Sequence, residues 1–311
     1  MALVSLEIPQ RLMASPASIE KLSVFAKVPE DRMLVLVRAG CALGLLKSRK
    51  NRVSLTRRGA ALVGVPGLVE MIRHHDVLYR DLSDPVAFFR GEAEPELANF
   101  WPYVFGKDIP QDAARTYSDL MAQSQVLVVE DTLQAVSLKG TSHLMDVGGG
   151  TGAFLEGVAS KYPSLDFTLF DLPQVAPHAA SRFETAGMTP RARIETGSFR
   201  NDPLPSGADM ISLIRVLYDH SDETVEALIA KCFDALPRGG RLLISEPMLG
   251  AVRPSRPGDV YFALYTLAMG TGKTRSPAEI KTLCESAGFE NVQIPKAARP
   301  FVTQAIIAQK L

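Results

Sequence analysis

Cysteine is scarce in this chain of 311 residues, and its scarcity excludes a disulfide-based framework. The three cysteines, Cys41, Cys232 and Cys284, lie far apart, are odd in number and include no C-x-x-C pair. A disulfide scaffold or a cysteine zinc site would require paired spacings. We therefore predict a protein of a reducing compartment, the cytoplasm, with no bound metal.

The sequence also lacks an excess of charge of either sign and any long hydrophobic run. Lys plus Arg and Asp plus Glu both total 34, so the net charge is zero and no overall field attracts nucleic acid or anionic lipid. No stretch reaches the ~18 uncharged apolar residues of a membrane span. The first residues, MALVSLEIPQRL, lack the features of a secretory signal. These absences predict a soluble protein.

Length and pattern together predict two domains. We expect residues 1–135 to form a mostly helical, winged-helix-like domain and residues 136–311 to form a ligand-binding α/β domain. In the first domain, helical apolar spacing and a short basic strand pair between residues 47 and 59 carry the prediction. The expected helices cover residues 18–27, 29–46, 68–81 and 115–136.

The second domain alternates apolar strands with helices, which is typical of a parallel, doubly wound sheet. The expected strands cover residues 143–147, 166–170, 192–195, 210–217 and 241–245, and the expected helices cover residues 153–162, 175–186 and 222–236. Two last strands, at 292–294 and 302–308, predict a terminal antiparallel hairpin.

The most specific local signal is the glycine-rich run LMDVGGGTGA, which begins at Leu144 and ends at Ala153. Its glycines lie between a predicted strand and a predicted helix, where they allow positive φ angles and close approach of a ligand to the backbone. The run also satisfies G-x-G-x-x-A, so glycine spacing alone fits a dinucleotide as well as another adenosine ligand.

Two acidic residues beside this loop favour a cationic adenosine ligand. Asp146 lies two residues before Gly148, where its carboxylate would repel a pyrophosphate and attract a cation. Asp171 lies 19 residues beyond Gly152, at the end of the second strand, where an acid commonly accepts hydrogen bonds from ribose. S-adenosylmethionine carries a sulfonium and an ammonium but no phosphate. We therefore predict it as the cofactor.

The third predicted strand is followed by two further candidates for contact with adenosine. Ser198 can form hydrogen bonds, and Phe199 can lie against the adenine ring. A core position at the strand end explains Phe199 equally well.

Four motifs in a fixed order resemble the plant-type O-methyltransferases that use S-adenosylmethionine: DVGGGTG from Asp146, FDLP from Phe170, RVLYDHSDE from Arg215 and LPRGGRLLISEP from Leu236. The resemblance spans about residues 15–311. It implies a Rossmann-like class I methyltransferase sheet with a terminal antiparallel hairpin, preceded by a winged-helix-like domain. It also places the cofactor on the residues that match the family's motifs: Gly148, Gly150, Asp171, Leu172, Ser198, Phe199 and Arg215, with Asp146 beside them.

Within this family the chain resembles most the bacterial carotenoid branch, which methylates the tertiary 1-hydroxyl of acyclic hydroxycarotenoids of the demethylspheroidene type. The motifs that carry this resemblance are GVPGL from Gly64, HHDVLYRDLSDPVAFFRG from His74, FWPYVFG from Phe100 and GSFRNDPLP from Gly197. The resemblance implies an apolar small-molecule substrate, a carotenoid. It is compatible with peripheral contact between a cytoplasmic protein and the photosynthetic membrane.

The chain departs from the family at the base of the reaction. The plant-type signature is L-H-D-W-S-D with His as the general base, whereas this chain has LYDHSD, so Tyr218 stands at the base position and His220 two residues later. Of the two flanking glutamates of the family, Glu246 matches the first, and Thr274 replaces the second. Phenol methylation by the usual scheme is therefore in doubt.

A neutral imidazole accepts a proton from an alkanol more readily than a phenol does. We therefore predict His220 as the base, Asp219 as the residue that orients it, and Tyr218 as a hydrogen-bond partner of the acceptor. Tyr218 as the direct participant is the competing prediction, and a surface position for His220 is the structural alternative. In an extended strand, positions 218 and 220 would project the same way.

A polyene substrate requires an apolar wall, and aromatic side chains in two segments are candidates. Tyr261, Tyr265 and Met269 fall on one face of a predicted helix over residues 259–269, although such stripes are usually core. Candidates also include His75, Phe100, Trp101, Tyr103 and Phe105. His74 and His75 are adjacent and cannot form the i, i+4 pair of a metal site. An interfacial structural role is the alternative for His75.

Three alternative functions remain open. Basic residues on the predicted winged helix, Lys47, Arg49, Lys50, Arg52, Arg57 and Arg58, would suit a DNA-binding regulator. The balanced charge of the rest of that domain argues against nucleic acid as a partner. The altered Tyr218 and Thr274 positions would also suit a relative that binds S-adenosylmethionine without transferring its methyl group. A methyltransferase of another small apolar or phenolic acceptor is the third alternative.

Members of the family form homodimers through a longer helical N-terminal region. We expect the apolar residues at the start of this chain, Leu3, Val4, Leu6 and Ile8, to belong to the end of such a helix. We therefore expect weakened dimerisation here, and an alternative start of the gene is compatible with this pattern.

Overall fold

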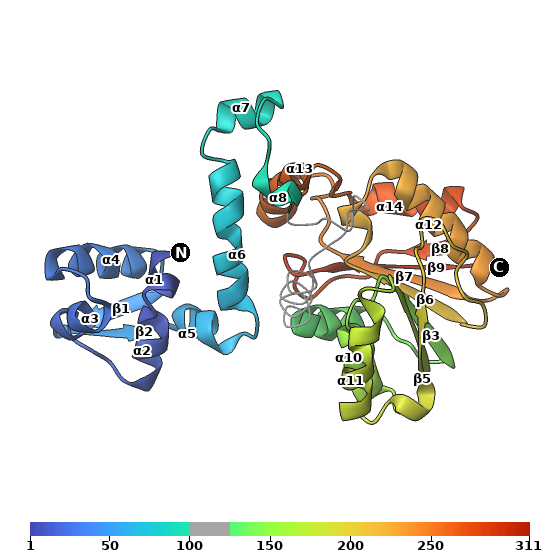
Figure 1. Cartoon of the computed structure of the whole chain (residues 1–311), viewed down its shortest axis with the longest axis horizontal. Helices are drawn as coiled ribbons and strands as arrows, with labels where there is room; N and C mark the ends of the chain where they lie inside the picture. The colour runs from blue at the N-terminus through green and yellow to red at the C-terminus, as the bar shows by residue number, and fades with distance from the viewer. Residues whose placement is uncertain (100–124) are drawn as a thin grey trace. The chain divides into compact units, whose positions relative to one another are not determined.

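A computed structural model describes residues 1–99 and 125–311 of the chain. It divides into two compact units, Met1–Arg80 and Asp81–Leu311 (Figure 1). Within the described residues, none of the helices combines the length and apolarity needed to cross a bilayer.

The N-terminal unit contains short helices and one antiparallel strand pair, as predicted. Its elements are α1 Ala2–Ser5, α2 Ile8–Ala14, α3 Ile19–Ala26, α4 Glu30–Ala42, β1 Leu46–Arg49, β2 Arg52–Leu55, α5 Arg57–Gly64 and α6 Leu68–Asp81. Ser18 caps α3 by accepting from the N–H of Lys21. The α4 helix ends at Ala42, earlier than predicted, because Gly44 adopts a φ of 70°.

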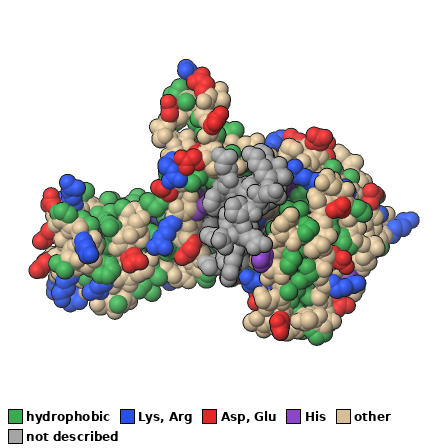
Figure 2. All heavy atoms as spheres, in the orientation of Figure 1, with side chains coloured by type: hydrophobic (Ala, Val, Ile, Leu, Met, Phe, Trp, Pro, Cys, Tyr) green, Lys and Arg blue, Asp and Glu red, His purple; other side chains and the backbone are tan. Residues whose placement is uncertain are grey.

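The core of this unit is small, and its surface is mixed in character. Ile8, Leu22, Met33 and Val53 are fully buried between the helices and the strand pair. Figure 2 shows acidic, basic and hydrophobic side chains side by side on the visible face of the unit. The similarity of this unit to a winged helix stays a prediction.

A seven-stranded sheet dominates the C-terminal unit, in the order β5-β4-β3-β6-β7-β9-β8 (Figure 1). Its strands are β3 His143–Val147, β4 Asp166–Asp171, β5 Ala192–Thr196, β6 Met210–Ile214, β7 Arg241–Glu246, β8 Glu290–Gln293 and β9 Gln304–Gln309. The first five strands pair in parallel, and β9 pairs antiparallel with both β7 and β8. The doubly wound sheet and its terminal hairpin are confirmed.

Helices cover both faces of this sheet because successive residues of the buried strands point to opposite sides. On β3, Leu144 packs with the cluster that includes α10 and α11, whereas Met145 packs with the cluster that includes α12 and α14. The helices of this unit, not all of which contact the sheet, are α7 Pro85–Arg90, α8 Glu96–Asn99, α10 Ala153–Lys161, α11 Ala179–Thr185, α12 Asp222–Ala235, α13 Ala263–Met269 and α14 Pro277–Ser286, with a further helical stretch at 125–135. Short 3-10 helices occupy Ala176–His178, Thr189–Arg191 and Leu217–Asp219.

Two predicted elements differ from the structure near the site. The strand expected over 210–217 ends at Ile214, because Arg215 adopts a φ of 59° and the chain turns into a 3-10 helix. The helix expected over 259–269 is a π-helix over Arg256–Phe262 that continues into α13. Because Leu217–Asp219 is a 3-10 helix, the side chains of residues 218 and 220 do not follow the same-side geometry of an extended strand.

Candidate active site

The glycine-rich loop between β3 and α10 is tightly packed at Gly149 and open at Gly150. Gly148, Gly150 and Gly152 have φ angles of 71°, 60° and 77°, which only glycine adopts without strain. A Cβ on Gly149 would lie 2.4 Å from Leu169 Cδ1, whereas a Cβ on Gly150 would meet nothing within 4 Å. The backbone at Gly150 is therefore accessible to a ligand.

Asp146 places a buried carboxylate directly under this loop. Its Oδ2 atom would lie 2.5 Å from a Cβ on Gly149, and its Oδ1 atom accepts a hydrogen bond of 2.6 Å from Ser212 Oγ. Among the described residues, Oδ2 has no hydrogen-bond partner. Burial raises the pKa of Asp146 to about 7, while the bond from Ser212 opposes that shift. The group is thus sensitive to a nearby positive charge.

Asp171 at the end of β4 faces the same loop. Its Oδ2 atom accepts from the N–H of Gly150 and its Oδ1 atom from the N–H of Leu172, both at 2.7 Å. Burial raises the pKa of Asp171, and the two backbone bonds oppose the rise. Each carboxylate oxygen accepts one bond and keeps the capacity to accept another. The carboxylate can therefore bind two neighbouring hydroxyls of a ligand.

The loop after β5 is fixed by a lysine that sequence reasoning missed. Lys231 Nζ, on α12, donates to the carbonyls of Phe199, Arg200 and Asp202 at 2.7, 3.0 and 2.8 Å. The N–H of Ser198 donates to Asp202 Oδ2 at 2.8 Å. A lysine facing a loop on another element leaves no signal in sequence spacing. These bonds fix the backbone of the loop that carries Ser198 and Phe199.

Phe199 joins this loop to both neighbouring parts of the site. One of its ring carbons, Cε1, would lie 3.9 Å from a Cβ on Gly148. Its ring also meets the ring of His220 edge to face, with centroids 5.2 Å apart. The predicted adenosine contacts and the predicted base are therefore neighbours in the structure.

The turn after β6 carries the predicted catalytic residues. Arg215 begins it, with its N–H donating to the carbonyl of Ser245 at 2.9 Å and its Nη2 atom 3.5 Å from the hydroxyl of Tyr218. Tyr218 is buried, and burial raises its pKa. Burial also raises the pKa of Asp219 well above its usual value, an effect that the Arg215 charge opposes.

His220 is held as a neutral hydrogen-bond acceptor. Arg200 Nη2, on the loop after β5, lies 3.1 Å from His220 Nδ1, and a guanidinium can only donate. Burial, followed by the charges of Arg200 and Arg275, lowers the pKa of His220 to about 3. The imidazole is therefore a much weaker base than its type predicts. Arg200 was not among the predicted site residues, because its partner lies 20 residues away on another loop.

Glu246 supports the catalytic turn from the end of β7. Its Oε2 atom accepts from the N–H groups of Leu217 and Tyr218 at 2.9 and 3.3 Å. Its Oε1 atom and Asp219 Oδ1 are buried and, within the described part of the chain, have no hydrogen-bond partner. Burial raises the pKa of Glu246 to about 7. Glu246 beside the turn and Asp219 within it therefore both carry carboxyl groups with raised pKa values.

Aromatic residues of the π-helix and α13 adjoin this turn. The ring of Tyr218 lies 6.3 Å from that of Phe262, and the rings of Tyr261 and Tyr265 lie 6.1 Å apart. Tyr265 and Met269 are buried. The ring of Tyr261 also contacts that of Phe262, with centroids 4.6 Å apart, so the predicted substrate contacts Tyr261 and Tyr265 lie close to the turn.

Phe100, Trp101, Tyr103 and Phe105 lie outside the described residues. His75 belongs to α6 of the N-terminal unit, where its Nδ1 atom contacts the carbonyl of Met71 and burial lowers its pKa.

The residues described above follow the carboxyl ends of adjacent parallel strands, where open α/β sheets bind ligands. Gly148 follows β3, Asp171 ends β4, Ser198 follows β5, Arg215 follows β6 and Glu246 ends β7. The structure thus brings the predicted cofactor and catalytic residues to one edge of the sheet.

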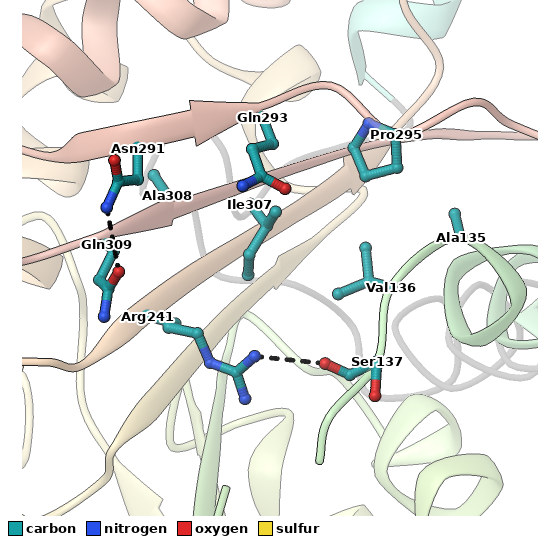
Figure 3. A pocket seen from close by; sticks show the side chains of 10 residues that line it. All are labelled: Ala135, Val136, Ser137, Arg241, Asn291, Gln293, Pro295, Ile307, Ala308 and Gln309. Atoms are coloured by element: carbon teal, nitrogen blue, oxygen red, sulfur yellow. Dashed lines mark hydrogen bonds between the residues drawn. The ribbon is translucent and has the colours of Figure 1, made fainter. Parts of the chain in front are cut away.

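A separate pocket of about 320 Å³ lies beside the amino end of β7, whereas the candidate site lies at the carboxyl ends of the parallel strands (Figure 3). Arg241, the first residue of β7, points into it and donates to the carbonyl of Ser137 at 3.3 Å. Its remaining lining residues come mainly from residues 135–137, β8 and β9. This pocket contains none of the predicted site residues.

Comparison with known proteins agrees with this geometry. A family model described as an O-methyltransferase domain matches residues 79–290. The chain is 52% identical over 312 aligned residues to a demethylspheroidene O-methyltransferase of Rhodobacter capsulatus, covering 100% of this chain and 78% of that one. It is 50% identical to the protein of the same name from Cereibacter sphaeroides, covering 99% and 82%.

Among solved structures, the chain is similar to CalO1, a methyltransferase in calicheamicin biosynthesis, in its form with bound S-adenosylhomocysteine. The TM-score is 0.83 at 22% sequence identity, over 100% of this chain and 92% of that one. This likeness confirms the class I methyltransferase fold, including its helical N-terminal region.

Proposed function

The chain belongs to the O-methyltransferase family, and from that premise we propose that it transfers the methyl group of S-adenosylmethionine to the tertiary 1-hydroxyl of an acyclic hydroxycarotenoid. The observation that carries the substrate is the 50–52% identity, over nearly the whole chain, to two demethylspheroidene O-methyltransferases. The proposed role is therefore a step of carotenoid biosynthesis.

The residues around the glycine-rich loop fit this cofactor. The open space at Gly150 would let the cofactor approach the backbone of the loop closely. The Asp171 carboxylate retains acceptor capacity for the two ribose hydroxyls. The unpartnered Oδ2 of Asp146 favours a cationic ligand nearby. Phe199 offers its ring to the adenine, and Leu172, Ser198 and Arg215 complete the set that would hold the cofactor.

When bound, S-adenosylmethionine supplies an activated methyl group whose leaving group is a neutral thioether. The protein's main contribution is then to hold the acceptor oxygen in line, which can be worth several orders of magnitude in rate. Tyr218, Tyr261 and Tyr265 lie where an apolar acceptor would be oriented. Trp101, Tyr103, Met269 and His75 remain predicted substrate contacts.

The acceptor proton also needs a base, and the carboxyl groups suit that role better than His220. A base is most effective when its pKa lies near the working pH. That of Glu246 is about 7, whereas that of His220 is about 3. Asp219 is half-buried and Glu246 fully buried, so Asp219 is the member that an acceptor can reach. We assign the proton to the pair Asp219–Glu246, and His220 to hydrogen bonding with Arg200.

Incubation with S-adenosylmethionine and a panel of acceptors tests the proposal. We expect S-adenosylhomocysteine and a methyl ether from acyclic 1-hydroxycarotenoids but not from flavonoid phenols or catechols. Turnover of phenols alone would contradict the carotenoid substrate and indicate a phenolic acceptor instead. Binding of the cofactor without any turnover would instead support a non-methylating relative. A salt-sensitive shift of duplex DNA in a gel would support the alternative of a DNA-binding regulator.

The wider setting of the enzyme also remains a proposal. We propose the functional division into residues 1–135 and 136–311, assembly as a homodimer, and a cytoplasmic location with peripheral membrane contact. Sedimentation as a monomer would contradict the second of these, and failure to bind vesicles of anionic lipid would contradict the membrane contact.

A further inference from the structure

The segment Thr271–Arg275 faces the catalytic turn along its whole length. It supplies a hydrogen bond to every backbone carbonyl from Leu217 to His220. The N–H of Lys273 donates to Tyr218 O at 2.9 Å, and Thr271 Oγ1 donates to Asp219 O at 3.3 Å. Arg275 serves the other two carbonyls, with Nη1 3.0 Å from Leu217 O and Nη2 3.0 Å from His220 O.

Arg275 is unusual because it is an almost fully buried arginine whose donors are all used. Its side chain is 1% exposed. Besides the two turn carbonyls, it donates from Nη1 to Lys273 O at 3.0 Å, and from Nε and Nη2 to Asp222 Oδ1 at 2.9 and 2.7 Å. These five bonds match the five N–H donors of a guanidinium. Lysine has fewer donors and no planar fork, so it cannot reproduce them.

The turn is therefore held from two sides by opposite chemistry. Glu246 accepts its leading N–H groups, at Leu217 and Tyr218, while Arg275 donates to its first and last carbonyls. The approach of the clamping segment is close, because a Cβ on Gly272 would lie 2.6 Å from Tyr218 O. Few conformations of the turn satisfy both sides at once.

We propose that Arg275 is a positioning residue, which fixes the Leu217–His220 turn so that Tyr218 and Asp219 meet the acceptor in reactive geometry. This inference rests on the proposed function, since the turn carries the groups assigned to the acceptor. It also gives the segment GKTRS a role of its own. Thr274, where the resemblance expects a glutamate, instead pairs with Thr266 Oγ1 at 3.2 Å, and the next residue holds the turn.

The variant Arg275→Lys in the full chain tests the proposal, because it keeps the charge and removes the fork. We expect kcat to fall about 10- to 100-fold, as misplacement of a reacting group by about 1 Å would cause. The KM for the acceptor should stay within about threefold, and so should the Kd for S-adenosylhomocysteine measured by calorimetry. Amide hydrogen exchange at residues 217–220 should accelerate, with protection of β3 and β4 unchanged.

Arg191→Lys is the matched control. Arg191 also donates to backbone carbonyls, of Tyr162 and Leu165, but it contacts no part of the turn. Its variant should keep kcat and the exchange rates of residues 217–220. If Arg275→Lys fails to fold, Gly272→Ala displaces the same turn without removing a charge, and the same loss of kcat is expected from it.

The outcomes distinguish a failure of the proposed function from a failure of the positioning role of Arg275. A wild-type protein that methylates none of the acceptors overturns the proposed function, although the exchange and calorimetric readouts can still be measured. A turnover-competent wild type whose Arg275→Lys variant keeps its kcat overturns the positioning role alone. A fall in kcat without faster exchange at residues 217–220 also overturns it, because the turn would then be undisturbed.

Discussion

Asp171 combines two tasks in one carboxylate: it fixes the glycine-rich loop and leaves acceptor capacity for a ligand. Asp171→Asn replaces one oxygen by a donor, so one backbone N–H and one ligand hydroxyl each lose an acceptor. We expect the Kd for S-adenosylhomocysteine to rise about 10- to 100-fold, in line with about 1.5–3 kcal/mol for hydrogen bonds to charged groups. Calorimetry measures the change.

Asp166→Asn is the control for this substitution, since Asp166 begins the same strand and is exposed. It should leave the affinity unchanged. An equal loss in both variants would mean that the acidic strand end acts only through general electrostatics.

The pH dependence of kcat distinguishes the two candidate bases. A base of pKa about 7, as for Glu246, must be deprotonated to act, so kcat should fall about tenfold per pH unit below 7 and level off above it. A base of pKa about 3, as for His220, is deprotonated throughout the range from pH 5 to 8, so kcat would be flat there. We expect the first profile for the wild-type protein, recorded at saturating acceptor.

Substitutions at Asp219, the accessible member of the carboxyl pair, and at His220 complete this test. Asp219→Asn should lower kcat by about 100-fold or more, the scale of general-base catalysis. His220→Gln keeps an acceptor for Arg200 and should retain kcat within about tenfold. The reverse pattern would return the proton to His220.

The identity of these residues could be predicted from the sequence, but their roles could not. Asp146, Asp171 and Glu246 lie at the carboxyl ends of β3, β4 and β7, which are on the same side of the sheet, so their proximity is implied by topology. The weak basicity of His220 depends on Arg200, which belongs to a different loop, and on burial, which no local pattern records. The donors of Arg275 likewise reach a turn more than 50 residues away.

Among the elements, the sheet was predictable because buried parallel strands are apolar runs between helices. The strand prediction is wrong at residues 215–217 for a local reason. Val216 and Leu217 are apolar and buried, like strand residues, but Arg215 adopts a positive φ that ends the strand. The π-helix over Arg256–Phe262 has the apolar spacing of a helix and therefore could not be distinguished from an α-helix.

Helix α10 and the helical stretch 125–135 approach closely through one glycine. A Cβ on Gly157 would lie 2.5 Å from Val129 Cγ1. Gly157→Ala should therefore lower the free energy of unfolding by about 1–3 kcal/mol, the usual cost of overpacking, despite the higher helix propensity of alanine. Denaturant unfolding measures this loss.

Val129→Ala in the same chain is the matched rescue. It removes the clashing methyl groups, so the double variant should recover most of the stability that Gly157→Ala loses. Additive losses in the double variant would show that the contact does not limit how closely the two helices approach.

At the scale of the whole molecule, an ion pair connects residues 168 positions apart within the C-terminal unit. Arg299, in the loop between β8 and β9, donates from Nε to both oxygens of the buried Asp131 at 2.8 and 3.0 Å, and from Nη2 to Glu130 at 2.6 Å. Beside it, Thr132, Ser245 and Thr303 form a chain of buried hydroxyls at 2.6 and 2.9 Å. These polar contacts tie the helical stretch 125–135 to β7, directly before Glu246.

Arg299→Met should destabilise this unit, because it leaves the Asp131 carboxylate buried without its cation. Loss of one partner of a buried pair typically costs 3–5 kcal/mol, and the partial exposure of Arg299 reduces our expectation to about 2–3 kcal/mol. Lys281→Met, which breaks the exposed pair with Glu285, should cost less than about 0.5 kcal/mol. Adding Asp131→Asn to Arg299→Met should restore most of the loss, and no recovery would mean that the arginine acts through packing alone.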